Sequence, residues 1–168
     1  MRVLGLDPGL RRTGWGVIEI DGAKLRFIAA GCIAAEVQET LAPRLAELHN
    51  AVMAITDQFT PDEVAIEETF VSVNPASTLK LGQARAAALL APALRGLPVA
   101  EYSPTQVKKS VTGSGSAGKE QVQGMIATLL PGFRGMGGPD AADALATAIC
   151  HAHHGATAAR WAAALLRS

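Results

Sequence analysis

The sequence predicts an α/β fold in which a five-stranded mixed sheet is flanked by helices. Three apolar segments with strand-like alternation come first, separated by Gly and Asp turn signals. A helical pattern follows, and after it comes a strand–helix–strand unit, which would place two parallel strands in the same sheet. The chain has 168 residues and no internal repeat. We therefore expect a single domain that spans residues 1–168.

The first four predicted elements are a meander and a helix that covers it. The alternating segments are Val3–Asp7, Trp15–Ile20 and Leu25–Ile33, and they predict three antiparallel strands. Between Thr40 and Phe59, apolar side chains recur at spacings of three and four, which predicts a helix with one apolar face. That face is expected to cover one side of the sheet.

The second half of the chain is predicted to add two strands and several helices. Val64–Glu67 and Pro98–Tyr102 predict short buried strands, and Ala76–Arg95 predicts the helix between them. The remaining predicted elements are all helical: a short helix near Gln106, a helix at Glu120–Leu130, and an alanine-rich pair that begins at Asp140 and near Ala156. This element order is that of the ribonuclease H-like fold, where strand one lies centrally beside strand four.

Composition argues against an exported protein and against a membrane protein. The longest apolar run, Ala86–Leu94, is interrupted by Pro92 and is too short to span a bilayer. Asp7 comes before any signal-peptide core could form, so a cytoplasmic location is expected. The two cysteines, Cys32 and Cys150, lie far apart in the sequence and predict reduced thiols rather than a disulfide scaffold.

The formal net charge is zero, but the charges are segregated along the chain. The acidic stretch from residue 36 to residue 68 has Arg44 as its one basic residue. The stretch from residue 70 to residue 119 has Glu101 as its one acid, and its basic residues are Lys80, Arg85, Arg95, Lys108, Lys109 and Lys119. This pattern permits phosphate contacts with DNA, and it is equally typical of two solvated faces that differ in sign.

Four carboxylates are predicted to converge at one end of the sheet. Asp7 ends the first strand and Glu67 ends the fourth, so two neighbouring parallel strands would bring both acids to the edge where open α/β sheets bind ligands. Asp140 and Asp143 open a late helix, and their spacing of three puts them on one helical face. Aspartates in a first helical turn also serve as caps, so for this pair a purely structural role is the alternative.

Four clustered carboxylates would require a cation, because they cannot all stay ionised without one. Oxygen-only ligands favour Mg²⁺ or Mn²⁺ over zinc, which would want His or Cys in the set. Two such ions about 4 Å apart would assist both the attacking water and the departing oxygen of a phosphodiester. The expected chemistry is therefore phosphodiester hydrolysis.

Four motifs in order resemble the bacterial RuvC family of Holliday-junction resolvases, and the resemblance covers nearly the whole chain. They are LGLDPGLRRTGWGV at Leu4–Val17, AIEETF at Ala65–Phe70, LKLGQAR at Leu79–Arg85 and DAADALA at Asp140–Ala146. The resemblance implies a Mg²⁺-dependent endodeoxyribonuclease of recombination and DNA repair that makes paired symmetric nicks in four-way DNA junctions and leaves 5′ phosphates. Its metal-binding catalytic acids would be Asp7, Glu67, Asp140 and Asp143, with two Mg²⁺ ions per site, for which Mn²⁺ would substitute.

The resemblance also implies basic and aromatic residues at the site. Lys108 and Lys119 match basic residues that meet the scissile phosphate, where they would stabilise the transition state. Lys108 and Glu67 each have a neighbour of the same charge, Lys109 and Glu68, and in a strand only one residue of such a pair faces the site. Which member faces inward is left open by the sequence.

Three further residues near the acids are candidate DNA contacts. Phe70 matches a family aromatic that would stack on an unpaired base at the junction centre, although a core phenylalanine is the alternative. Arg11 and Arg12 follow Asp7 in a glycine-flanked turn and would touch backbone phosphates, or they would form a solvated turn. From the basic stretch we add Lys80 and Arg85 as candidate DNA contacts.

Two other patterns are set aside. Residues 113–119, GSGSAGK, fit most of a Walker A motif, but Glu120 stands where a P-loop needs a hydroxyl, and no apolar strand precedes the glycines. A loop that presents Lys119 to DNA explains them better. His151, His153 and His154 resemble a metal cluster, but in a straight helix His151 would lie about 12 Å from Asp143. We expect these histidines to form a solvated helix end.

A four-way junction has approximate two-fold symmetry, so a homodimer is the expected assembly. The helix Ala76–Arg95 would form its interface, with packing on the sheet as the alternative. The resemblance also implies cooperation with the RuvA and RuvB branch-migration complex. Two rival functions remain: a ribonuclease H-like nuclease that acts on RNA or on RNA–DNA hybrids, and a catalytically silent junction-binding module. An assay with junction, duplex and hybrid substrates distinguishes them.

Overall fold

The computed structural model describes residues 1–9, 11–34, 40–69 and 73–165. Its five strands form one mixed sheet in the order β3-β2-β1-β4-β5. The first three strands are the predicted antiparallel meander, with β1 at Arg2–Asp7, β2 at Arg12–Asp21 and β3 at Lys24–Ala34. Strand β4 (Glu63–Glu67) runs parallel to β1, and β5 (Val99–Tyr102) runs parallel to β4. The predicted central place of strand one beside strand four is therefore confirmed.

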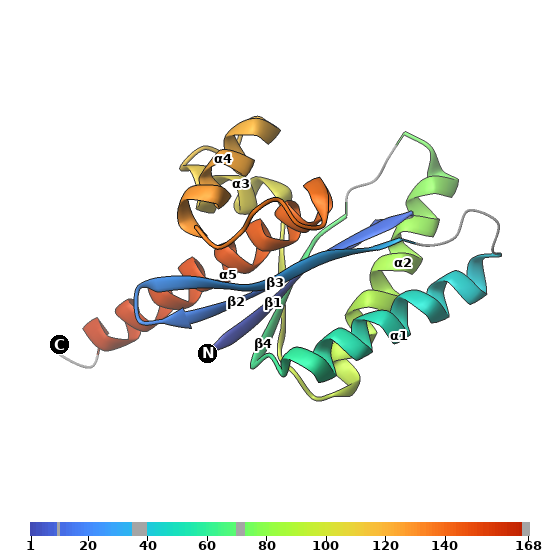
Figure 1. Ribbon diagram of the computed structural model, residues 1–168, viewed down its shortest axis with the longest axis horizontal. Coiled ribbons are helices and arrows are strands. Elements are labelled where there is room, and N and C mark those ends of the chain that lie inside the picture. Colours follow the sequence, from blue (N-terminus) through green and yellow to red (C-terminus); the bar gives the residue numbers. More distant parts are fainter. Residues whose placement is uncertain (10, 35–39, 70–72, 166–168) are drawn as a thin grey trace.

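Helices cover both faces of the sheet (Figure 1). Helices α1 (Leu41–Phe59) and α2 (Pro75–Leu94) pack together on one face. The other face is covered by α5 (Gly138–Leu165), beside which lie α3 (Pro104–Thr112) and α4 (Lys119–Leu129). Within the described residues, no helix is both long enough and apolar enough to cross a membrane.

The two faces follow from the alternation of side chains along β1. Leu4 and Leu6 are fully buried in the core that includes α1 and α2, whereas Val3 is buried in the core that includes α5. Odd-numbered residues of β1 thus point toward α5. Asp7, the last residue of the strand, continues this alternation.

Glycines allow α5 to lie directly against β1 and β2. A Cβ atom at Gly5 would lie 2.1 Å from the carbonyl oxygen of Ala144, and one at Gly14 would lie 1.9 Å from the carbonyl oxygen of Asp140. No larger residue fits at either position without a shift of the α5 backbone. This close packing brings the start of α5 over the ends of β1 and β2.

Local signals explain where several helices begin and end. The side chain of Asn74 accepts hydrogen bonds from the first N–H groups of α2, and Ser103 with Gln106 forms a capping box at the start of α3. Helix α1 ends at Thr60, which has a left-handed φ of 45° and precedes Pro61. Each of these boundaries lies within a few residues of the one that the sequence predicts.

Two predicted boundaries are wrong. Strand β2 begins at Arg12 rather than Trp15, because Thr13 and Gly14 still pair with β3. The predicted pair of terminal helices is one continuous helix, α5, which passes through Gly155. An isolated glycine costs only about 1 kcal/mol in a helix, so it does not force a break.

Candidate active site

Asp7 and Glu67 end neighbouring parallel strands and face the same side of the sheet. Leu6 pairs with Ile66 across β1 and β4, and continuing this register by one residue places Asp7 opposite Glu67. On its other side Asp7 pairs with Gly14, whose missing side chain would point at Asp140 on α5. Both acids therefore face the layer that contains α5.

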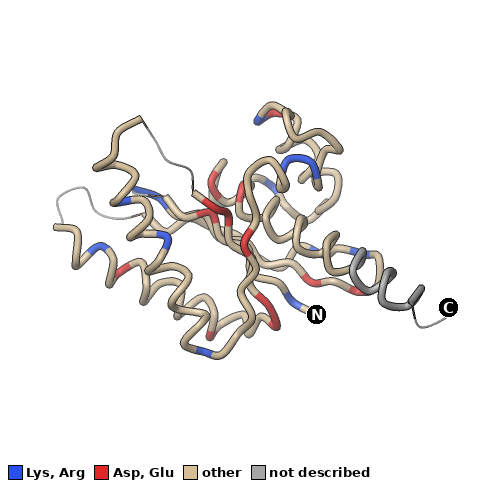
Figure 2. The backbone as a smooth tube through the Cα atoms, turned by 180° about the vertical axis from the view of Figure 1, so that it is seen from behind, with Lys and Arg blue, Asp and Glu red and all other residues tan. Residues whose placement is uncertain are grey.

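The acids line a cavity of about 280 Å³ between the sheet, α3, α4 and α5. Asp7, Glu67 and Asp143 contribute its carboxylates, and Lys108 and Lys119 contribute its cations. In Figure 2, acidic positions gather near the middle of the molecule, between the α1–α2 pair and the α3–α4 pair. The cavity thus brings together residues from five elements that are widely separated in the sequence.

Burial and mutual repulsion disfavour the charged forms of the two strand acids. The pKa of Asp7 is raised to about 7, first by burial and then by repulsion from Asp143 and Asp140, with Lys119 acting in the opposite direction. The pKa of Glu67 is raised to about 8 by burial and by repulsion from Asp7 and Asp143. Lys108 and Lys119 only partly offset this repulsion. Burial and repulsion therefore favour the protonated forms of Asp7 and Glu67 near neutral pH.

Each aspartate at the start of α5 contacts a cation from another element. The Lys119 Nζ lies 3.1 Å from an Asp143 carboxylate oxygen. The Arg12 Nε donates a hydrogen bond of 2.8 Å to Asp140, and the Cys32 thiol lies 3.8 Å from the same carboxylate oxygen. Asp140 thus lies beside the cavity rather than among its lining residues.

Sequence reasoning missed the contact between Arg12 and Asp140. The two residues are 128 positions apart, and Arg12 was assigned to a turn rather than to the start of β2. Local periodicity carries no information about such a pair. The one available signal was Gly14, whose place among strand residues indicates close approach of another backbone.

The structure answers both questions that paired like charges had left open. Lys108 lines the cavity, whereas Lys109 is exposed and lines a separate groove with His153 and His154. Glu67 lines the cavity, whereas no cavity contact is described for Glu68, whose backbone N–H bonds to the carbonyl of Tyr102.

The other predicted DNA contacts lie in different surroundings. Arg11 is exposed in the loop before β2, and Lys80 is exposed on α2. The Arg85 side chain is only 19% exposed, forms an ion pair with Glu101 and donates a hydrogen bond of 3.2 Å to the backbone carbonyl of Glu67. Arg85 therefore holds the end of β4 in place. Phe70 lies outside the described residues.

The expectation of a solvated histidine cluster is wrong for His151 and His153, whereas His154 is exposed as expected. The His151 side chain is only 12% exposed and lies between two partners, the hydroxyl of Tyr102 at 2.8 Å and the carboxylate of Glu63. His153 contacts both the hydroxyl and the carbonyl of Ser110. The three elements that these contacts join to α5 are β4, β5 and α3. Alternating polarity within an alanine-rich helix gave no indication of these partners.

The glycine-rich loop before Lys119 joins two helices. Gly113, with a φ of 82°, ends α3, and Gly118 is the N-cap of α4. Lys119 is thus the first residue of α4, and it reaches Asp143 from there. A P-loop instead follows a strand, so the arrangement agrees with the decision to set that motif aside.

The donor set fits a hard divalent cation. All four side chains offer carboxylate oxygens, and the pKa values of Asp7 and Glu67 are raised by burial and then by repulsion from neighbouring acids, both of which a bound cation would offset. In the described part of the chain, no three Asp, Glu, His or Cys side chains are placed so that they hold one metal ion. Arg12 and Lys119 each occupy one carboxylate oxygen, Oδ2 of Asp140 and Oδ2 of Asp143 respectively.

Comparison with known proteins gives matches along nearly the whole chain. The family described as crossover junction endodeoxyribonuclease RuvC matches residues 3–151. A protein of that name from Paramagnetospirillum magneticum is 58% identical over 167 residues, covering 99% of this chain and 100% of the relative. Another, from Rhodospirillum rubrum, is 59% identical over 158 residues, covering 94% of this chain and 93% of the relative.

Comparison with solved structures also gives resolvases of Holliday junctions. The structure of Thermus thermophilus RuvC in complex with a Holliday junction substrate superimposes with a TM-score of 0.87 at 34% identity, covering 94% of this chain and 96% of that one. The yeast mitochondrial Holliday junction resolvase superimposes with a TM-score of 0.63 over 88% of this chain and 76% of that one. At 16% identity, this second similarity concerns the fold alone.

Proposed function

The chain belongs to the RuvC family of crossover junction endodeoxyribonucleases, and we propose that it cuts Holliday junctions by metal-assisted hydrolysis at the cavity formed by Asp7, Glu67 and Asp143. Its fold is the ribonuclease H-like fold, and it is an endonuclease that resolves four-way DNA junctions in recombination and repair. The family implies dependence on a divalent metal ion. The observation that carries the proposal is the convergence of these acids with Lys108 and Lys119 in one cavity.

The four carboxylates would hold the metal. When bound, two Mg²⁺ ions would supply an activated water and stabilise the departing 3′ oxygen, which leaves a 5′ phosphate on the product. Asp7 and Glu67 project from rigid strand ends, so they fix the site relative to the sheet. Asp143 and Asp140 approach from α5 and complete the set.

The cations at the site are proposed to change partners when DNA and metal bind. Lys119 now pairs with Asp143, and Arg12 pairs with Asp140. Once these aspartates bind metal, Lys119 is available to contact the scissile phosphate and stabilise its developing negative charge. Lys108 already faces the cavity and would contact the same phosphate.

We further propose that the enzyme works as a homodimer. Helix α2 exposes three large apolar side chains, Leu79, Leu90 and Leu94, with exposed fractions of 65%, 49% and 63%. Burial of these side chains against a second copy would remove an apolar surface from water, and a two-fold dimer matches the symmetry of the junction. We also propose that the enzyme cooperates with RuvA and RuvB, as the family implies, and that it acts in the bacterial cytoplasm, where its DNA substrate would lie.

A substrate comparison tests the proposed function. The enzyme is offered a four-way junction, a linear DNA duplex and an RNA–DNA hybrid of the same sequence, each with Mg²⁺ or with chelator. We expect symmetric nicks in the junction alone and only with Mg²⁺. Cleavage of the hybrid would support a ribonuclease H-like nuclease instead, and junction binding without cleavage in Mg²⁺ would indicate a silent binding module.

A further inference from the structure

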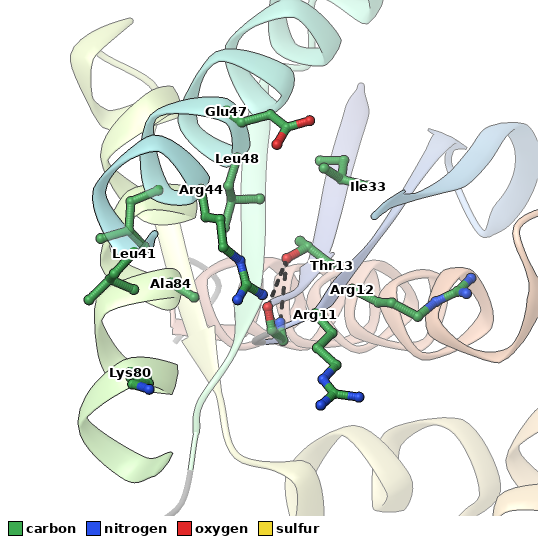
Figure 3. A pocket seen from close by; sticks show the side chains of 12 residues that line it. Arg11, Arg12, Thr13, Ile33, Leu41, Arg44, Glu47, Leu48, Lys80 and Ala84 are labelled. Carbon is green, nitrogen blue, oxygen red and sulfur yellow. Dashed lines mark hydrogen bonds between the residues drawn. The ribbon is translucent and has the colours of Figure 1, made fainter. Parts of the chain in front are cut away.

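A basic groove, separate from the cavity that contains the acids, lies beside the loop that follows Asp7. Its apolar floor is formed mainly by Ile33 at the end of β3, by Leu45 and Leu48 on α1, and by Ala84 on α2. Figure 3 shows basic side chains around this floor. The groove thus lies between the α1–α2 pair and the start of β2.

Three cations from three different elements meet at this groove. Arg11 comes from the loop before β2, Arg44 from the first turns of α1, and Lys80 from the first half of α2. Among the described residues, no ion pair involves Arg11 or Lys80. Arg44 has a further interaction of its own. Convergence of cations that are far apart in the sequence is unlike the scatter of an ordinary solvated surface.

The groove contains one carboxylate, and its position leaves the basic end unopposed. Glu47 lies at the far end of the groove from Lys80 in Figure 3. The first turn of α1, which also borders the groove, contains no acid. The N-terminal end of the α1 dipole adds to the positive potential there.

The size of the groove limits its occupant. Its volume is about 40 Å³, which is room for a few water molecules and hence for one tetrahedral anion, but not for a nucleobase. The apolar floor suits the deoxyribose carbons that flank a backbone phosphate. A single phosphate group of a DNA strand therefore fits the charge, the size and the floor of the groove.

The groove is joined to the active site by one loop. Gly9, Arg12 and Thr13 line the groove, and they follow Asp7 directly in the chain. The Arg12 guanidinium reaches from this loop to Asp140. This connection along the chain would allow one DNA strand to contact both the acids and the groove of Arg11, Arg44 and Lys80.

We propose that this groove binds a backbone phosphate of the junction other than the one that is cut. The inference rests on the proposed function, because it takes junction DNA as the substrate. It assigns to Arg11, Arg44 and Lys80 a role in holding and orienting the DNA, whereas Lys108 and Lys119 act at the scissile phosphate.

The test measures junction binding as a function of salt for Lys80→Gln, Arg11→Gln and the double variant. Binding is followed in chelator, so that the DNA stays intact. Because the groove holds one phosphate, complete loss of this contact should make the fall of log K with log salt less steep by about 0.9. We expect part of that decrease for each single variant and about the full decrease for the double variant, with several-fold weaker binding each time.

The control is Lys24→Gln, which removes the same charge from the exposed β2–β3 hairpin and should change neither slope nor affinity. An unchanged slope in the double variant would overturn the inference, and so would a large fall in kcat without weaker binding. If the double variant instead changes the oligomeric state in sedimentation and leaves DNA affinity unchanged, the groove contacts a second copy and the inference is wrong. Wild-type cleavage in the same series tests the proposed function separately.

Discussion

Asp7 lies at the point where β1, β2 and α5 meet, so its side chain is expected to affect the proposed metal site more than the proposed DNA surface. It is largely buried and carries a pKa raised to about 7. Its neighbours are acids, whereas the cations proposed to hold DNA lie around it. Chemistry and binding should therefore respond differently when this one residue is changed.

Asp7→Asn should abolish cleavage while leaving junction binding intact. The amide keeps the size of the side chain but cannot supply a charged metal ligand, so the rate should fall by a factor of about 10² or more. Single-turnover cleavage and a gel-shift titration in chelator measure the two properties separately. Loss of binding in this variant would contradict the assigned role, as would activity within tenfold of wild type.

The raised pKa values of Asp7 and Glu67 predict a pH-dependent requirement for Mg²⁺. At pH 6 both acids largely retain their protons, which compete with metal ions, and by pH 8 Asp7 is ionised and Glu67 is about half ionised. The Mg²⁺ concentration for half-maximal cleavage should therefore fall by about tenfold or more between pH 6 and pH 8. Rates measured across a Mg²⁺ series at three pH values give this number. A constant half-maximal concentration would contradict the prediction.

The same shift predicts a stability change for Glu67→Gln. Because the pKa of Glu67 is raised in the folded state, its cost to folding is absent below about pH 4, grows as the pH rises, and is complete above about pH 8. In chelator, the wild-type Tm should fall over this range more than the Tm of Glu67→Gln. Each kcal/mol of relieved cost corresponds to about 2–4 °C. Equal Tm differences at pH 5 and pH 8.5 would contradict this.

At the scale of elements, the position of α5 on the sheet determines where Asp140 and Asp143 lie. This position depends on Gly5 and Gly14, because their lack of a side chain lets the helix backbone lie against the strands. Arg85 does the same for the other side of the site, because it ties α2 to the end of β4 and to Glu101 on β5. Backbone packing thus sets the positions of the proposed catalytic acids.

Gly14→Ala should both destabilise the protein and reduce cleavage. The new Cβ atom would lie 1.9 Å from a backbone oxygen of α5, so the helix must shift at a cost of about 1–3 kcal/mol. The matched control is Gly124→Ala in α4, where no atom lies within 4 Å of the new Cβ. There the substitution should stabilise by about 0.5–1 kcal/mol. Thermal unfolding and cleavage rates of the two variants provide the comparison.

The sequence predicted every strand and the helices of the first half, because periodicity and turn residues are local signals. It also placed Asp7 and Glu67 at one sheet edge, since parallel pairing follows from the order of elements. It did not predict the partners of Asp140 or of His151, because these contacts join elements far apart in the chain. The sequence did not predict that α5 continues through Gly155, because a single glycine is only a weak signal for the end of a helix.

At the scale of the whole molecule, the two faces of the sheet carry different surface features. The α5 face contributes the cavity of carboxylates, and the α1–α2 face contributes the small basic groove and the exposed leucines of α2. A dimer through α2 would leave both active-site cavities open to DNA. Two cavities in one assembly are what a pair of symmetric cuts requires.

Leu79→Glu together with Leu94→Glu should shift the enzyme toward monomers and uncouple the two cuts. Charge at these exposed positions opposes burial in an apolar interface without disturbing the core. Sedimentation measures the assembly, and a cruciform plasmid reports the cuts: paired cutting gives linear DNA, whereas single cutting gives nicked circles. Ala127→Glu, at an exposed position on α4, adds the same charge elsewhere and should retain paired cutting. A double variant that remains dimeric would contradict the assignment of the interface.

The unbroken course of α5 has a further consequence for how the enzyme tolerates change. The helix carries Asp140 and Asp143 at its start and is fastened again, two turns beyond Asp143, where His151 meets Tyr102 and Glu63. Because α5 is held both at its start and at His151, it should keep its orientation when the segment before it is lengthened or shortened. Changes in residues 131–137 should therefore leave Asp140 and Asp143 aligned, provided that Phe133 still packs on Phe27 and that Gly137 keeps its close approach to Gly31.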